Sequence, residues 1–298
     1  MDSRDGRGQL ILVAGFGLAV AFVALALVLN TVVFTENLAT RNHDRTDEAL
    51  AFEGAVEQGV GGIVSEVNDN ESATYVSLQA ELNASIPQWS DNATLLSAAR
   101  GSLRNGSLAG VENGTRLARP STGKLATGDL AVDVSETRRF QLFVTPESAT
   151  GVTVEVAGDD DLWSVTVSNS TENPSWTDVV VSQNGDVVAQ NTTKSNTVEV
   201  DLTEGLVNGT RVANWTFAGG VDAPYTISVT GDGETTGKYV LFVDEQVSDL
   251  TTDAPTATPA IYRAYVDISV RTDALTYESN VSVAPSDPPG NETYALDG

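Results

Sequence analysis

The chain has 298 residues, enough for one or two domains with a buried core. Its 41 acidic residues outnumber 16 basic ones, and the net charge of -25 argues against binding nucleic acid or anionic lipid surfaces. With no cysteine and a single histidine, His43, the chain lacks disulfides, thiolate metal sites and any Ser-His-Asp triad remote from that residue.

The basic residues include only three lysines. An acidic surface poor in lysine suits concentrated salt, where screening removes most of the self-repulsion. We therefore expect a halophilic source, with an acidic surface protein from an ordinary habitat as the alternative.

The chain begins with a short charged leader that lies directly against an apolar run. Arg7, Gly8 and Gln9 precede about twenty uncharged residues, from Leu10 to Leu29. A run of this length crosses a bilayer as a helix, whereas a secretory signal has a shorter apolar core followed by a cleavage site. We expect a leader over residues 1–8, a cut after Gly8, and a transmembrane helix over residues 9–34.

The segment from Arg7 to Gly15 resembles the class III signal sequences of archaeal type IV pilin-like proteins and archaellins. The resemblance covers about the first 45 residues and extends to haloarchaeal pilin-like surface proteins through residues 35–41. Val13 stands where many bacterial-type pilins have glutamate, but archaellins lack that glutamate too. The resemblance implies a prepilin-peptidase-like processing enzyme and assembly with other pilin-like subunits.

The apolar run also predicts self-association, because small residues recur four positions apart. Gly15 with Ala19, and Gly17 with Ala21, would let helices approach closely. The alternative is that glycine and alanine are common in any single-pass span.

Residues 35–104 are predicted to form a helical stalk. Leu38, Ala49, Phe52, Val56, Ile63 and Val67 recur at roughly helical spacing, although the glycines at 59, 61 and 62 weaken the helix. Two shorter helices are expected next, over residues 72–86 and 93–103. The first has an apolar face at Tyr75, Leu78, Leu82 and Ile86; the second, capped by residues 90–92, has one at Leu95, Leu96, Ala99 and Leu103.

Residues 105–128 are rich in Gly, Asn and Ser and predict a linker, whereas residues 129–250 alternate polar and apolar residues as short strands do. Asn184-Gly185 is a two-residue hairpin signal. Many short strands indicate an antiparallel β-sandwich, with strands expected near residues 130–134, 140–144, 152–156, 162–167, 179–181, 187–188, 197–202, 212–217, 225–229 and 238–243.

Residues 251–298 are predicted to comprise a Thr/Pro-rich linker, a final strand pair over 261–270 and 275–283, and a disordered tail.

Sequons for N-glycosylation indicate export. Composition alone would give about three or four, but the chain has eleven, all from residue 70 onward. This excess predicts a cytoplasmic N-terminus and an extracellular C-terminal domain. The acceptor asparagines are Asn70, Asn83, Asn92, Asn105, Asn113, Asn169, Asn191, Asn208, Asn214, Asn280 and Asn291.

Candidate chemistry is sparse. Residues 159–161 and 232–234 place carboxylates in expected turns, where calcium is an alternative to simple solvation. Four tryptophans, Trp89, Trp163, Trp176 and Trp215, predict core packing, with a sugar-binding surface as the alternative. No cofactor or metal site is expected.

These observations predict an α+β protein: a long N-terminal transmembrane helix, short helices and an antiparallel β-sandwich-like extracellular domain in a single-pass membrane protein. The predicted function is a non-enzymatic, membrane-anchored pilin-like subunit, minor or pseudopilin-like, whose N-terminal helix mediates retention and assembly. The alternatives are a permanently anchored surface glycoprotein (an adhesin or binding module) and a tethered extracellular enzyme.

Overall fold

The computed structural model describes residues 49–69, 74–98, 101–273 and 275–284. The chain divides into two compact units, Met1–Phe52 and Glu53–Gly298. Only residues 49–52 of the first unit are described, so the account below concerns the second. A first helix covers residues 49–68, and α2 is Tyr75–Ala98.

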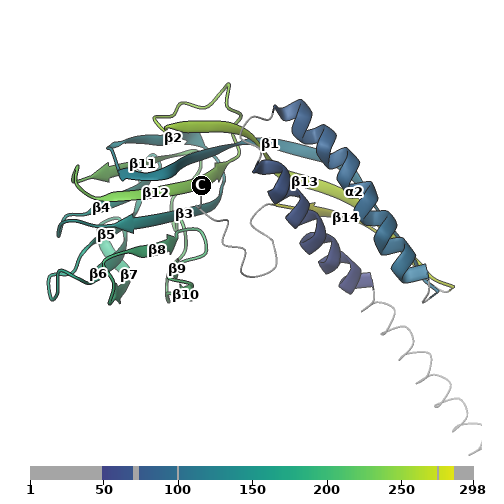
Figure 1. The fold of residues 1–298 in the computed structure, drawn as a ribbon, viewed down its shortest axis with the longest axis horizontal. Coiled ribbons are helices and arrows are strands. Elements are labelled where there is room, and N and C mark those ends of the chain that lie inside the picture. Colours follow the sequence, from purple (N-terminus) through teal and green to yellow (C-terminus); the bar gives the residue numbers. More distant parts are fainter. Residues whose placement is uncertain (1–48, 70–73, 99–100, 274, 285–298) are drawn as a thin grey trace, which may run out of the picture. The chain divides into compact units, whose positions relative to one another are not determined.

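Fourteen antiparallel strands in the described residues form two sheets (Figure 1). The eight-stranded sheet has the order β10-β9-β8-β3-β12-β1-β13-β14, and the six-stranded sheet has the order β2-β11-β4-β5-β6-β7. The strands are β1 (Leu103–Lys124), β2 (Gly128–Val134), β3 (Thr137–Thr145), β4 (Val152–Ala157), β5 (Leu162–Asn169), β6 (Thr177–Gln183), β7 (Asp186–Thr193), β8 (Val198–Asp201), β9 (Leu206–Val207), β10 (Thr210–Arg211), β11 (Tyr225–Gly231), β12 (Thr236–Val243), β13 (Thr256–Arg271) and β14 (Thr276–Val283).

The two sheets enclose the main hydrophobic core. Alternate residues of each strand point inward, so fully buried side chains come from both sheets, among them Leu142 and Leu241 on one side and Val154, Val165 and Val181 on the other. This arrangement confirms the predicted β-sandwich part of the fold.

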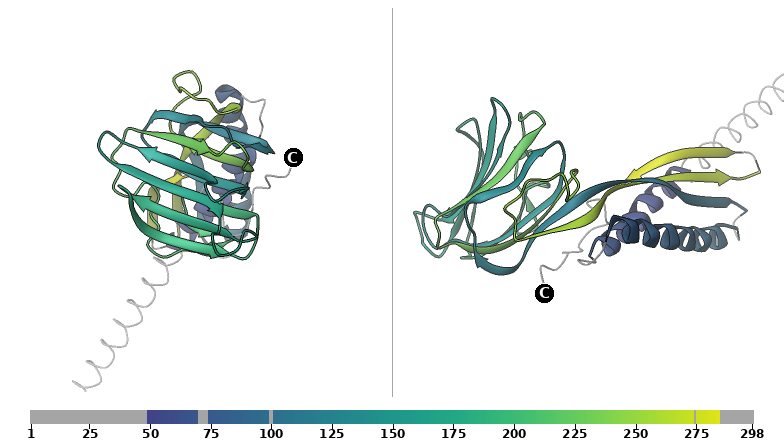
Figure 2. Two further views of the ribbon diagram at one scale, coloured as in Figure 1. Left: turned by 90° about the vertical axis from the view of Figure 1, so that its left-hand side faces the viewer. Right: turned by 90° about the horizontal axis from the view of Figure 1, so that it is seen from above.

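The eight-stranded sheet continues beyond the sandwich as an arm. The arm consists of residues 103–113 of β1, residues 264–271 of β13, and β14, and the two helices lie against one of its faces (Figures 1 and 2). Both helices bury an apolar stripe, with Val56, Val60 and Val64 on the first and Leu78, Leu82 and Ile86 on α2.

The longest strand of the sandwich, β1, was expected to be a linker. Residues 105–128 are poor in strand-forming residues, yet most of them belong to β1, which pairs with β13 over residues 103–118 and with β12 over residues 115–124. Pairing on both sides overrides weak intrinsic strand propensity. Gly114 shows why glycine is useful here: an added Cβ would collide with the carbonyl oxygen of Val243 and lie 2.9 Å from the Cβ of Tyr262.

The helical region differs from the prediction in two respects. The first helix runs unbroken through the glycines at 59, 61 and 62, because the packing of its buried stripe outweighs their low helix propensity. Gly59 also provides the space in which the indole ring of Trp89 packs. One helix, α2, replaces the two expected; it passes through Pro87, and Leu95 and Leu96 are 73% and 77% exposed rather than inward.

The predicted cap at residues 90–92 serves another purpose. The buried Ser90 hydroxyl accepts a hydrogen bond from the backbone N–H of Gly106 (2.7 Å) and donates one to Oδ1 of Asn105 (3.2 Å). These bonds fasten α2 to β1, so the residue that would have started a second helix stabilises the contact between elements instead.

Most of the predicted strands are confirmed, and the Asn184-Gly185 turn has positive φ at both residues, 49° and 88°. Residues 212–217 are not a strand: they form turns, and Trp215 and Phe217 enter the core from them. Part of the expected Thr/Pro linker belongs to β13, where Pro259 is tolerated because β13 there pairs with β1 alone among the described strands.

The predicted α+β class is wrong, because the described chain is mostly antiparallel β with two helices packed on one sheet. Within the described residues, neither helix has the length and apolarity needed to cross a bilayer. This finding contradicts the expected transmembrane helix and the single-pass membrane location. The residues for which that helix was predicted, 9–34, lie outside the described ranges.

Candidate functional site

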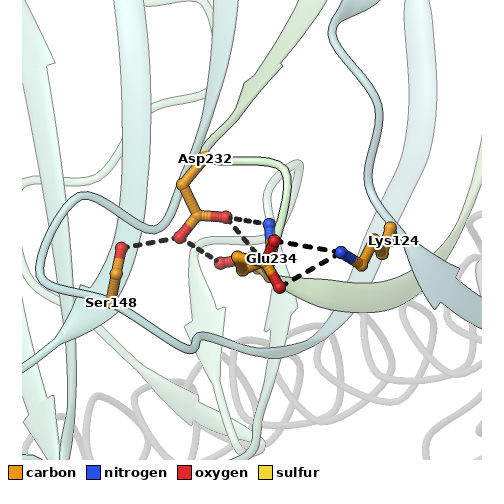
Figure 3. Close-up of polar contacts among 5 residues, drawn as sticks. Lys124, Ser148, Asp232 and Glu234 are labelled. Atoms are coloured by element: carbon orange, nitrogen blue, oxygen red, sulfur yellow. Dashed lines mark hydrogen bonds and ion pairs between the residues drawn. The ribbon is translucent and has the colours of Figure 1, made fainter.

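The acidic turn at residues 232–234, a calcium candidate from sequence, is a closed hydrogen-bond network between β11 and β12 (Figure 3). The Asp232 carboxylate accepts four hydrogen bonds: from Ser148 Oγ (2.6 Å), Glu234 N (2.8 Å), Thr235 N (2.6 Å) and Thr235 Oγ1 (3.0 Å). Glu234 points to the other side and pairs with Lys124 Nζ at 3.1 Å on the protein surface.

The network fixes the charge of Asp232. Burial alone would raise the pKa of its carboxyl group, but the hydrogen bonds outweigh this effect and lower the pKa to about 2. A carboxylate with so low a proton affinity is a poor general base at neutral pH. Asp232 therefore closes the turn and is not suited to proton transfer.

The second acidic turn, residues 159–161, is also committed to local structure. Asp161 Oδ1 accepts a hydrogen bond from Asn184 Nδ2 (2.9 Å), and Asn184 Oδ1 accepts one from the backbone N–H of Leu162 (2.8 Å). These bonds tie the β4–β5 turn to the β6–β7 turn. Across the ranges that the structure describes, no three His, Asp or Glu side chains are grouped as metal ligands.

The four tryptophans divide into two classes. Trp163 and Trp215 are core residues, 1% and 8% exposed, in edge-to-face contact with centroids 6.3 Å apart, and Trp215 Nε1 donates to Leu202 O (2.9 Å). Trp89 is half-buried against Gly59. It also lines a groove between the first helix and α2, whereas Trp176, half-buried too, lines a groove on the six-stranded sheet. The expectation of core packing holds for Trp163 and Trp215.

This groove, which we call the Trp176 groove, lies at one end of the outer face of the six-stranded sheet. Its volume is about 380 Å³, and Lys194 Nζ lies 5.1 Å from the centroid of the indole ring. Across its floor, Thr192 Oγ1 donates to Asp178 Oδ1 (2.7 Å). The remaining lining residues are Ser170, Thr171, Glu172, Val180, Gln190 and Asn191. It is the best candidate for a binding site.

The described sequons lie mostly on the surface. Asn83, Asn92, Asn105, Asn208, Asn214 and Asn280 are exposed, whereas Asn113, Asn169 and Asn191 are half-buried. Among the exposed ones, the Nδ2 groups of Asn83, Asn208 and Asn280 donate hydrogen bonds to neighbouring residues.

Several predicted residues lie outside the described ranges. These are the leader residues Arg7, Gly8 and Gln9, the small residues Gly15, Gly17, Ala19 and Ala21, the sequon residues Asn70 and Asn291, and His43.

Sequence reasoning missed a charge network where the arm joins the sandwich. Arg263 on β13 pairs with Glu136 Oε2 (2.8 Å) in the β2–β3 turn and with Glu112 Oε2 (3.4 Å) on β1, and Tyr265 Oη donates to Glu112. The hydrogen bond with Tyr265, then the two carboxylates, raise the pKa of Arg263 against the opposing effect of burial. Because its acidic partners lie more than 120 residues away in sequence, no local pattern could have indicated the network.

Comparison with known proteins gives one match. Residues 4–122 are similar to a family of unknown function, DUF7261. The similarity runs from the leader almost to the end of β1, and the strands from β2 onward lie beyond it. No curated protein and no solved structure matches the chain.

Proposed function

We propose that the chain is a non-enzymatic, pilin-like surface subunit of the minor or pseudopilin-like kind. The observation that carries the proposal is the leader, in which Arg7, Gly8 and Gln9 directly precede the apolar run, as in the class III signals it resembles. A prepilin-peptidase-like enzyme would cut after Gly8. The mature chain would then begin at Gln9.

Assembly would use the apolar run. The small residues Gly15, Gly17, Ala19 and Ala21 would contact neighbouring pilin-like subunits, because small side chains permit close approach. The sequons and the net charge of -25 support an exported part that stays hydrated in salt.

The N-terminus of the protein from its native host tests the proposal. Wild type is expected to start at Gln9, and Gly8→Leu should retain residues 1–8, because a bulky residue blocks a cut that requires glycine. Gly6→Leu, which alters the other leader glycine, is the matched control and should be processed normally. Intact-mass measurement distinguishes these products. A wild-type chain that starts at Met1 or Ser3 contradicts the proposal.

A second candidate function, a surface adhesin or binding module, is favoured by a different observation. The Trp176 groove combines a half-buried indole with charged and amide side chains on the outside of the sandwich. Aromatic surfaces with a few placed polar groups are typical of ligand sites. In this case the chain would act through what it binds, whether or not it assembles.

A further inference from the structure

Strand register places the functional side chains of the Trp176 groove on one face. Buried Thr177, Val179 and Val181 point into the sandwich, so Asp178 and Val180 point outward from β6. Asp178 lies opposite Thr192 of β7, and Val180 lies opposite Gln190. Trp176 and Lys194, one position beyond the pair Thr177–Thr193, lie on this outer face as their cation–π contact requires.

The groove offers the mixed chemistry that a polyhydroxylated ligand requires. Asp178 and Glu172 present carboxylate acceptors, Gln190 an amide that donates and accepts, and Lys194 an ammonium donor. Asp178 uses Oδ1 for Thr192, while Oδ2 has no hydrogen bond from a described residue. Sugar hydroxyl groups both donate and accept, so they can satisfy such a set, and the C–H face of a sugar ring can pack on the indole of Trp176.

Charge disfavours anionic ligands that could stack on tryptophan. Two carboxylates and one ammonium give the groove a net negative charge within a chain of net charge -25. Phosphates of a nucleic acid, and acidic polysaccharides, would be repelled. Purely apolar ligands are disfavoured as well, because Val180 is the only aliphatic residue among those described in the lining.

We propose that the Trp176 groove binds a neutral carbohydrate, with Trp176 as the stacking platform and Asp178 and Gln190 as hydrogen-bonding residues. The inference deepens the binding-module candidate and is independent of leader processing. Stacking and hydrogen bonding to a neutral ligand survive concentrated salt, whereas recognition of charged ligands weakens there.

The test is an array of neutral gluco-, manno- and galacto-configured oligosaccharides, followed by titration of the full chain with a bound member at low salt and at about 2 M salt. We expect binding at both salt concentrations. Trp176→Ala should weaken it about tenfold or more, and Asp178→Asn by a smaller factor. Lys238→Met is the control, because Lys238 makes the same kind of cation–π contact with Phe143 (5.8 Å) on a different sheet.

Three results would overturn the inference: no neutral glycan binds, binding disappears at high salt, or Trp176→Ala binds as wild type does. Circular dichroism spectra and melting temperatures of the variants must match wild type, so that a loss of binding reports on the groove. If Trp176→Ala is unfolded, Trp176→Phe is used instead and should weaken binding by a smaller factor. Because the readout is ligand binding, failure here leaves the N-terminal test of the assembly proposal unaffected.

Discussion

Replacing Asn68 with alanine tests whether buried hydrogen bonds fasten the first helix to β13. The side chain of Asn68 is 2% exposed; its Nδ2 donates to Ile261 O (2.9 Å), and its Oδ1 accepts from Ile261 N (2.7 Å). Alanine would leave both backbone groups of Ile261 buried without this partner, at about 1–3 kcal/mol each. We expect the free energy of unfolding to fall by about 2–6 kcal/mol, a large share of a typical total of about 5–15 kcal/mol.

Urea denaturation followed by circular dichroism measures this loss as a lower midpoint at an unchanged slope. The control is Asn280→Ala in unglycosylated protein, because Asn280 Nδ2 donates to Asp267 Oδ1 (2.8 Å) on an exposed strand pair. That change should cost less than about 1 kcal/mol. If Asn68→Ala loses no more stability than Asn280→Ala, the reasoning is refuted.

Asn68→Asp separates the two hydrogen bonds by pH. The ionised carboxylate can still accept the hydrogen bond from Ile261 N, but its other oxygen faces the carbonyl oxygen of Ile261, and two acceptors repel. The protonated acid can instead donate a hydrogen bond to Ile261 O. The folded state should therefore raise the pKa of this new group above its unfolded value of about 3.9. Stability should be closest to wild type below about pH 4 and should fall as the pH rises above that value. A difference from wild type that does not vary with pH contradicts this prediction.

Two further predictions concern β1 and the Asp232 turn. Gly114→Ala should lower the free energy of unfolding by more than about 2 kcal/mol, because the added Cβ meets Val243 O and Tyr262. Gly110→Ala on the same strand is the control: its Cβ meets nothing within 4 Å, so it should change stability by less than about 1 kcal/mol. Equal losses for the two variants in urea denaturation would contradict the packing. For Asp232, the pKa is lowered to about 2 from 3.8, so its contribution is present above about pH 4 and is lost as the pH falls through about 2. Wild type should therefore be more stable than Asp232→Asn by about 1 kcal/mol at neutral pH, a small value because solvent screens this partly exposed group. The difference in free energy of unfolding should shrink towards zero as the pH is lowered, and a difference that stays constant would refute the assignment.

Local periodicity predicted the strands that pair with their neighbours in sequence. Strands β4 to β7 form successive hairpins, so alternation within each strand and a turn such as Asn184-Gly185 carry most of the information needed. In contrast, β1 takes its stability from β12 and β13, which lie more than a hundred residues later. Its glycines and asparagines predict a loop, because the strands whose pairing outweighs this local propensity are distant in sequence.

The helices and the candidate site were predicted only in part. The buried stripe at Leu78, Leu82 and Ile86 follows from helical spacing, but the outward direction of Leu95 and Leu96 depends on α2 continuing past Pro87. The sequence marked four tryptophans and could not single out Trp176. Trp176 lies one residue before β6, and it is on the outer face because Thr177 and Val179 point into the core. Which of these alternate residues points inward is decided by how β6 packs in the sandwich.

The position of β1 also determines when the sandwich can be completed during synthesis. The ribosome releases β1 long before β12 and β13 exist, whereas the hairpins from β4 to β7 have their partners almost at once. These hairpins can therefore form early, whereas β1 can pair with β12 and β13 only at the end of synthesis. Contacts so distant in sequence slow the final step and expose unpaired edges meanwhile. A chain truncated before residue 256 would keep its hairpins but leave β1 without its principal neighbour.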